Sequence, residues 1–219
     1  MAGIPAEYPK IDVEDGRGTL KRSIFSLALA AALLVAAPMA HGALIHLFVN
    51  LNGANEVPSN AVTSTTAGTG TASFDLDTTL HTLHGVILFS GLTGTTTASH
   101  IHCCLASPFA NAAVGVATVV PAFPGFPLGV QSGTDEFTLQ LNNASAYNPA
   151  FVTAQGGLIN AEAAFVAGLT TGRTYLNIHT TQFGGGEIRG FVVPEPMTIS
   201  LFALGLAAAG FVSRRRKPM

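Results

Sequence analysis

Short segments of alternating polarity dominate the middle of this chain and leave little freedom in its fold. From Thr71 to Asp77, apolar and polar residues alternate, and Leu83 to Phe89 is a second β-rich segment shortly afterwards. A period of two is typical of strands with one buried face, and the short connection predicts an antiparallel hairpin. Similar patterns predict further strands at 44–51, 98–104, 115–120, 136–141, 174–180 and 187–193. This many short strands predict a mainly-β fold, a sandwich or a barrel.

One segment breaks this pattern. Asn148-Pro149 opens a stretch through Gly168 whose Phe151 and Phe165 would share one side of a helix with other apolar residues. Asparagine before proline is typical of a helix start, and glycine of a helix end. We therefore expect one or two short helices here.

The N-terminal part has the order of a secretory signal. Lys21-Arg22 precede an apolar stretch from Ile24 to Ala37, and the small residues Ala40, Gly42 and Ala43 follow. Charge, apolar core and small residues in this order are typical of a cleaved signal peptide. Residues 1–42 are thus predicted to be an extended n-region with a signal peptide, and the folded body to span 43–193.

The C-terminal part, residues 194–219, has three components. Pro194-Glu195-Pro196 is followed by an uncharged apolar run from Met197 to Val212 and then by Arg214, Arg215, Arg216 and Lys217. At about 1.5 Å per residue the run would form a helix of roughly 24 Å, slightly short for a permanent membrane span. The cations would remain cytoplasmic, which places the body outside.

Those three components resemble the bacterial PEP-CTERM sorting signal. The resemblance implies that an exosortase-type sorting protease cuts near Pro194-Glu195-Pro196, and that the helix anchors the chain in the membrane only before processing. The alternative is an ordinary tail anchor. In either case we expect export across the inner membrane to the cell surface or beyond.

The body is acidic once both targeting segments are set aside. Residues 43–193 contain seven acidic residues and only two basic ones, Arg173 and Arg189, which gives a net charge of −5. Contacts between cations and phosphates supply most of the affinity for nucleic acids, and here those cations are almost absent. Nucleic acid is therefore excluded as a partner.

The two cysteines, Cys103 and Cys104, are adjacent. A disulfide between neighbours would crosslink no distant parts of the chain, and would therefore add little stability. The pair is either two half-buried residues at a strand end, or a redox switch or soft metal ligand.

The polar and ionisable side chains suited to chemistry lie in three short sequence segments, called strings below. In Ser99-His-Ile-His102, strand alternation sends His100 and His102 to one face. In Tyr175-Leu-Asn-Ile-His179 the same alternation aligns Tyr175, Asn177 and His179. Glu187 and Arg189 share a face in Gly186-Glu-Ile-Arg-Gly190, and an antiparallel hairpin would bring them near Asn177 and His179.

The three strings, together with the first hairpin, resemble a CHRD domain from about Leu47 to Val193. The family implies a β-sandwich resembling an immunoglobulin-like fold, and it implies no settled activity. The chain departs from the family pattern at Gln182-Phe183-Gly184, where a proline is often found, and at Cys104. These departures put the shape of the turn in question, not the domain.

Two interpretations of the polar residues remain open. His100, His102 and His179 could bind copper or zinc, because imidazoles at i and i+2 on a strand can meet one ion and a third can complete the site. Alternatively, Asn177, His179, Glu187 and Arg189 form a structural network without a cofactor, with Arg189 forked onto Glu187.

Two functions correspond to these interpretations. The first is a structural or adhesive role at the cell surface or in the extracellular matrix, with a polysaccharide or a matrix protein as partner and no catalysis. The second is a metal-dependent oxidoreductase that uses the three histidines.

Overall fold

We describe a computed structural model of the chain, covering residues 44–56 and 66–195. The elements are β1 (Leu44–Asn52), η1 (Gly53–Asn55), β2 (Thr69–Asp77), β3 (Thr82–Ser90), β4 (Thr96–Cys103), β5 (Gly133–Gln140), η3 (Ala144–Ala146), α2 (Pro149–Ala154), α3 (Leu158–Thr170), β6 (Thr174–Thr180), β7 (Ile188–Phe191) and β8 (Val193–Pro194). The prediction of a mainly-β antiparallel fold with short helices is confirmed, and the helical segment forms two of them.

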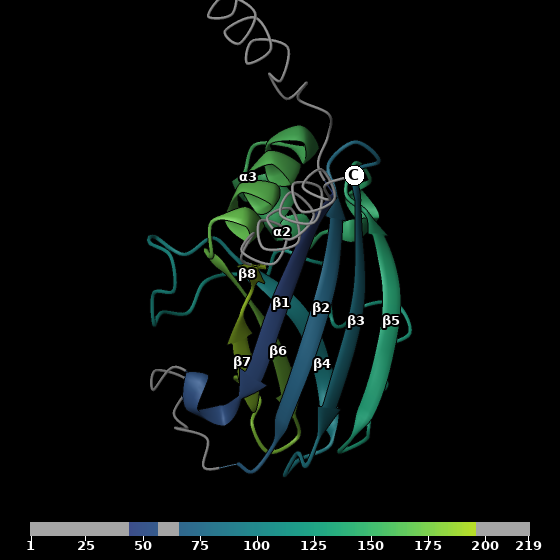
Figure 1. Cartoon of the computed structure of the whole chain (residues 1–219), viewed down its shortest axis with the longest axis vertical. Helices are drawn as coiled ribbons and strands as arrows, with labels where there is room; N and C mark the ends of the chain where they lie inside the picture. The colour runs from purple at the N-terminus through teal and green to yellow at the C-terminus, as the bar shows by residue number, and fades with distance from the viewer. Residues whose placement is uncertain (1–43, 57–65, 196–219) are drawn as a thin grey trace, which may run out of the picture. The chain divides into compact units, whose positions relative to one another are not determined.

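The strands belong to one eight-stranded antiparallel sheet that curls over itself. Its order is β4-β6-β7-β1-β2-β3-β5, with β8 paired to β1. The joint between β7 and β1 is narrow, since only Asn52 and Arg189 pair there. The sheet folds over at this joint, so that the broad layer of β1, β2, β3 and β5 lies in front of β4, β6 and β7 in Figure 1. At the edge of the sheet formed by β4, Thr96 exchanges main-chain hydrogen bonds with Gly129 and Val130.

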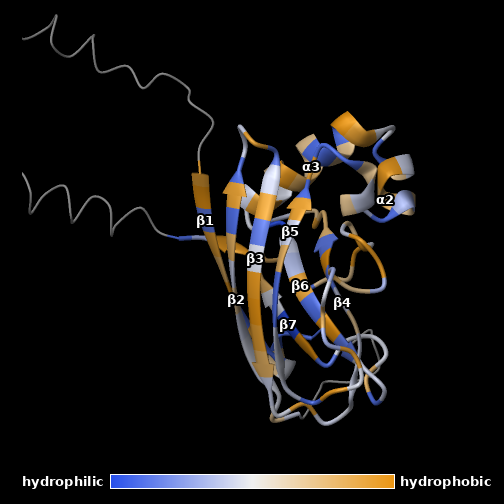
Figure 2. Cartoon of the chain, turned by 90° about the vertical axis from the view of Figure 1, so that its right-hand side faces the viewer, coloured by the Kyte–Doolittle hydropathy of each residue, from blue (hydrophilic) through white to orange (hydrophobic). Residues whose placement is uncertain are grey.

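The apolar core lies between the two layers. Alternation along each strand sends one set of residues inward, as the burial pattern of β2 shows. Figure 2 shows that the lower part of β3 is hydrophobic throughout. Phe74, Leu76, Leu83 and Ile87 from the broad layer are at most 1% exposed. Ile101, Leu176, Ile178 and Ile188 from the other layer are fully buried in the same core. The first hairpin pairs as expected, with Asp77 opposite Thr82 and Thr71 opposite Leu88.

The predicted strand at 115–120 is wrong. Its main chain bonds to two partners in turn: Ala117 N donates to Ile101 O, whereas Val119 N donates to Ala146 O. Only isolated bridges form, at Val116 and Thr118. A segment that alternates between partners builds no continuous ladder with either, so it remains a loop across β4.

The targeting segments lie outside the described residues. The predicted signal peptide at 1–42 and the apolar run from Met197 to Val212 are not covered, nor are Pro196 and Arg214 to Arg216. Within 44–56 and 66–195, no helix is long and apolar enough to cross a membrane. Pro194 and Glu195 are described, and Pro194 pairs with Leu47 of β1.

Candidate functional site

The face of β4, β6 and β7 that points away from the apolar core is also buried. The loop that follows β4 covers it, through Val114 and Pro121 among others. Burial of both faces is unusual for residues of this polarity, and buried polar groups require partners. The residues on this second face, all expected from strand alternation to share a side, are His100 and His102 on β4, Tyr175, Asn177 and His179 on β6, and Arg189 on β7.

The structure brings His100, His102 and His179 together as one cluster. One ring nitrogen of each lies within 4.8 Å of those of the other two. The Nε2 atoms of His100 and His179 are 3.0 Å apart. The strand register produces this meeting, since Ala98 and His100 of β4 pair with His179 and Asn177 of β6. His100 and His102 are 6% and 8% exposed, and His179 is half-buried.

The opposite nitrogen of each ring contacts a main-chain carbonyl. The Nδ1 atoms of His100, His102 and His179 lie 3.1, 2.7 and 2.9 Å from the carbonyl oxygens of Pro121, Val114 and Gly184. A carbonyl only accepts, so each Nδ1 must donate its hydrogen. In a neutral ring the lone pair is then on Nε2. All three histidines therefore carry their lone pair on Nε2, and the Nε2 atoms of His100 and His179 face each other.

Burial keeps these rings neutral. It lowers the pKa of His100 to about 4, with a further contribution from His179. Burial lowers the pKa of His102 to about 3 against the opposing hydrogen bond to Val114, and it also lowers the pKa of His179. Among the residues that the structure describes, the buried Nε2 of His102 has no hydrogen-bond partner. Neutral imidazoles with converging lone pairs form a set of nitrogen ligands suited to zinc or copper.

Tyr175 and Arg189 support the cluster from one side. The Tyr175 ring stacks on His102, with centroids 4.5 Å apart and planes 10° from parallel. The guanidinium carbon of Arg189 lies 3.5 Å from the Tyr175 ring centroid, a cation–π contact. The Tyr175 hydroxyl accepts a hydrogen bond from Val114 N, next to the carbonyl that holds His102. We expected Tyr175 on this face, but nothing in the sequence indicated that it stacks on a histidine.

Glu187 and Arg189 have different partners from those of the expected network. The Arg189 Nη2 donates to Ala112 O at 3.0 Å. The Glu187 carboxylate accepts from the Thr66 and Thr180 hydroxyls at 2.5 and 2.8 Å. It also accepts from Thr93 N and Gly94 N at 2.5 and 3.1 Å. Asn177 donates to Gly185 O at 3.4 Å.

The Glu187 carboxylate therefore joins three parts of the chain. Its donors come from the segment before β2, the loop before β4 and the end of β6. Burial alone would raise its pKa, but the hydrogen bonds from Thr66, Thr93, Gly94 and Thr180 lower the pKa below the ordinary 4.5. These donors were not predictable, because threonine and main-chain amides carry no distinctive sequence signal.

Cys103 and Cys104 form a disulfide at the end of β4. Both sulfur atoms lie near the carbonyl oxygen of Ala164 on α3, at 3.8 and 3.5 Å. A Cβ on Gly168 would come within 2.7 Å of the Cys103 sulfur. The disulfide thus packs directly against α3.

We predict that Glu187→Gln destabilises the fold by about 2 to 4 kcal/mol at pH 7, because the amide brings two N–H donors to a site already filled with donors. A depressed carboxyl pKa contributes stability above the unfolded pKa and loses it as the pH falls through the folded pKa. The difference in the free energy of unfolding between parent and variant should therefore shrink below pH 4.5. Urea unfolding at several pH values measures this free energy for both proteins.

Glu136→Gln is the matched control, since the Glu136 side chain is 73% exposed on β5. Its stability should follow that of the parent. Equal stability of Glu187→Gln and the parent at pH 7, or a difference that does not change with pH, would contradict the assigned role of Glu187.

Comparison with known families identifies two segments of the chain. A family model described as the CHRD domain matches residues 47–192, and a PEP-CTERM protein-sorting motif matches residues 192–217. Comparisons with curated proteins and with solved structures gave no match. The sorting motif points to export, to processing by an exosortase-type system and to a cell-surface or extracellular location. The chain belongs to the CHRD domain family and carries a PEP-CTERM sorting motif at its C-terminal side.

Proposed function

We propose that this exported domain binds one copper or zinc ion through the Nε2 atoms of His100, His102 and His179. The observation that carries the proposal is that each of the three clustered rings is held at Nδ1 by a main-chain carbonyl, which leaves Nε2 as the ligand atom. In metal sites, a hydrogen bond from the second ring nitrogen fixes the tautomer and the direction of the ligand. Here all three such bonds are already in place.

The short distance between His100 and His179 supports the same conclusion. Their Nε2 atoms are 3.0 Å apart, yet both Nδ1 atoms must donate elsewhere. Two neutral rings in this tautomer have no hydrogen to share between their Nε2 atoms. A cation removes the repulsion between the lone pairs. With metal–nitrogen bonds of about 2.0 to 2.1 Å, ligand atoms around a tetrahedral ion lie roughly 3.3 Å apart, close to this spacing.

Three neutral imidazole ligands would not neutralise the positive charge of the ion. They would also leave the fourth coordination position of a tetrahedral ion free. His100 and His102 are buried, whereas His179 is half-buried and lies toward solvent. Access would therefore come from the side of His179. A bound copper ion would supply one-electron chemistry and a bound zinc ion would supply Lewis acidity. In the chain itself, Tyr175 and Arg189 would hold the His102 ring and limit its rotation.

We predict that the exported protein, purified without chelator and loaded with copper or zinc, retains about one ion per chain after gel filtration. The double variant His100→Ala/His102→Ala should lose the ion, because one imidazole cannot hold it. Elemental analysis measures the ratio, and circular dichroism checks that the variant is folded.

His46→Ala/His84→Ala is the matched control. These two histidines lie on the outer face of the broad layer, where His46 contacts Asp75 and His84 contacts Thr138. The control should retain the ion. A parent protein that retains neither metal, or a triad variant that retains as much as the parent, would contradict the proposal.

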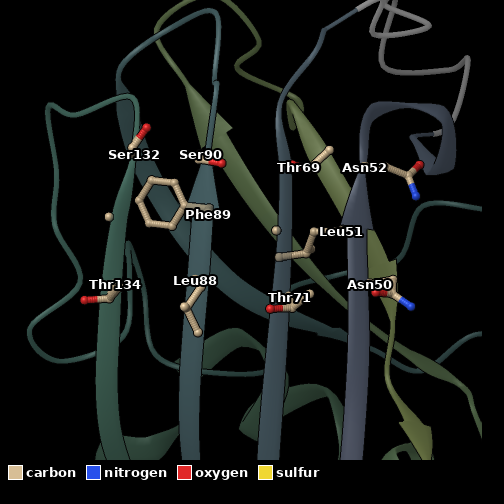
Figure 3. A pocket seen from close by; sticks show the side chains of 12 residues that line it. Asn50, Leu51, Asn52, Thr69, Thr71, Leu88, Phe89, Ser90, Ser132 and Thr134 are labelled. Atoms are coloured by element: carbon tan, nitrogen blue, oxygen red, sulfur yellow. The ribbon is translucent and has the colours of Figure 1, made fainter.

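An adhesive role is a second candidate, favoured by a groove on the outer face of the broad layer. It has a volume of about 970 Å³. Figure 3 shows two rows of side chains crossing four strands, with Asn50, Thr71, Leu88 and Thr134 in one row and Asn52, Thr69, Ser90 and Ser132 in the other. None of the described residues that line it is charged. Amide and hydroxyl groups suit a neutral extracellular polysaccharide better than a charged matrix protein.

We predict that Thr71→Arg/Thr134→Arg, which fills the groove, weakens binding to the neutral polysaccharide of the producing cell. Thr138→Arg on the same face of β5 but outside the groove is the control. Affinity electrophoresis in gels containing the polysaccharide measures the retardation. Equal retardation of the parent and the groove variant would exclude this site as the adhesive surface.

A further inference from the structure

Large apolar side chains are exposed together at one end of the sheet. Leu44, Leu80 and Ile159 are 56%, 66% and 84% exposed. Leu44 starts β1 and pairs with Asp77, Leu80 lies in the turn that follows Asp77, and Ile159 lies in the first turn of α3. A hollow of about 280 Å³, lined by Ile159, Asp77 and apolar residues of β2 and α3, lies beside them.

Side-chain hydrogen bonds hold the turn and the helix at this apolar end in place. The Asp77 carboxylate accepts hydrogen bonds from Thr79 N and Leu80 N, both at 2.8 Å, and so holds the turn that presents Leu80. The His81 Nδ1 lies 2.5 Å from Glu162 Oε1 and joins the same turn to α3. Leu80 and Ile159 are therefore held on neighbouring, connected elements.

The chain leaves the domain at the same end. β8 pairs with β1, and Glu195 N donates to His46 O, close to Leu44. β8 also contacts α3. Figure 1 shows α3 at the upper end, where β1 begins. Only Pro196 separates Glu195 from the apolar run that starts at Met197. Two residues span at most about 7 Å, so a membrane segment would begin next to this surface.

We propose that the apolar end formed by Leu44, Leu80 and Ile159 rests on the bilayer while the sorting segment is still attached. The partner is a zwitterionic lipid surface. Apolar side chains gain stability at the boundary between headgroups and acyl chains. The acidic residues at this end are Asp75, Asp77, Glu162 and Glu195, and the described residues that line the hollow include no lysine or arginine. Anionic lipids would repel these carboxylates. The domain would thus face the membrane with its apolar end, and Pro194-Glu195-Pro196 would lie at the membrane surface.

The absence of tryptophan from the sequence makes a direct test possible. The full chain, carrying Leu80→Trp or Ile159→Trp as its single tryptophan, is reconstituted into phosphatidylcholine vesicles with brominated or ordinary acyl chains. Bromine quenches tryptophan only at short range, so both variants should lose emission in brominated vesicles. Replacing part of the lipid with phosphatidylglycerol should not increase the loss.

Two further single-tryptophan variants decide the outcome. Leu128→Trp is the matched control, because Leu128 is 50% exposed in the loop before Gly133, which pairs with Phe89 at the opposite end of the sheet. It should keep its emission. Phe202→Trp reports insertion of the apolar run and should be strongly quenched. Emission unchanged at Leu80→Trp and Ile159→Trp, quenching at Leu128→Trp equal to theirs, or no quenching at Phe202→Trp would each overturn the proposal.

Discussion

The site depends on one constraint: three clustered imidazoles, two of them buried and one half-buried, must each give their Nδ1 hydrogen to a main-chain carbonyl. The carbonyls belong to Val114, Pro121 and Gly184, two in the loop after β4 and one in the turn after β6. With these bonds made, no ring can turn without losing a hydrogen bond. The covering loop and the directed Nε2 atoms are therefore parts of the same arrangement, and the polar face of β4 and β6 stays closed because the histidines hold the loop.

The other charged residues stabilise the frame around this cluster. Glu187 gathers four donors from segments far apart in the sequence, and Arg189 is stacked on Tyr175 where β7 meets β1. The cation–π contact with Tyr175 stabilises the guanidinium, and the Glu56 carboxylate contributes a favourable charge interaction. The hydrogen bonds of Glu187 and Arg189 reach different parts of the chain. Glu187 connects the loops at the end of β6, and Arg189 supports the ring that packs on His102.

Much of the fold could be predicted from residue alternation. The first hairpin, the faces of β4 and β6 and the helical segment after Asn148 follow from periodicity and turn residues, because these are local properties. The side of the strand shared by His100 and His102 was predictable for the same reason. Their meeting with His179 was one of two open interpretations, because it depends on a pairing register between β4 and β6 that no local pattern determines. The Tyr175 stack and the covering carbonyls depend on the path of a long loop. The apolar, β-rich segment at 115–120 forms no strand, because its main chain bonds to two different partners.

The central claim is that three Nδ1-protonated histidines direct their Nε2 atoms at one ion. Histidine-selective ¹⁵N–¹H NMR of the metal-free protein, followed by titration with zinc, tests it most directly. The account predicts that His100, His102 and His179 all show the neutral tautomer with hydrogen on Nδ1, and that their three Nε2 signals shift together at one equivalent of zinc while the other histidines do not. Hydrogen on Nε2 in any of the three, or signals that do not respond to zinc, would contradict it.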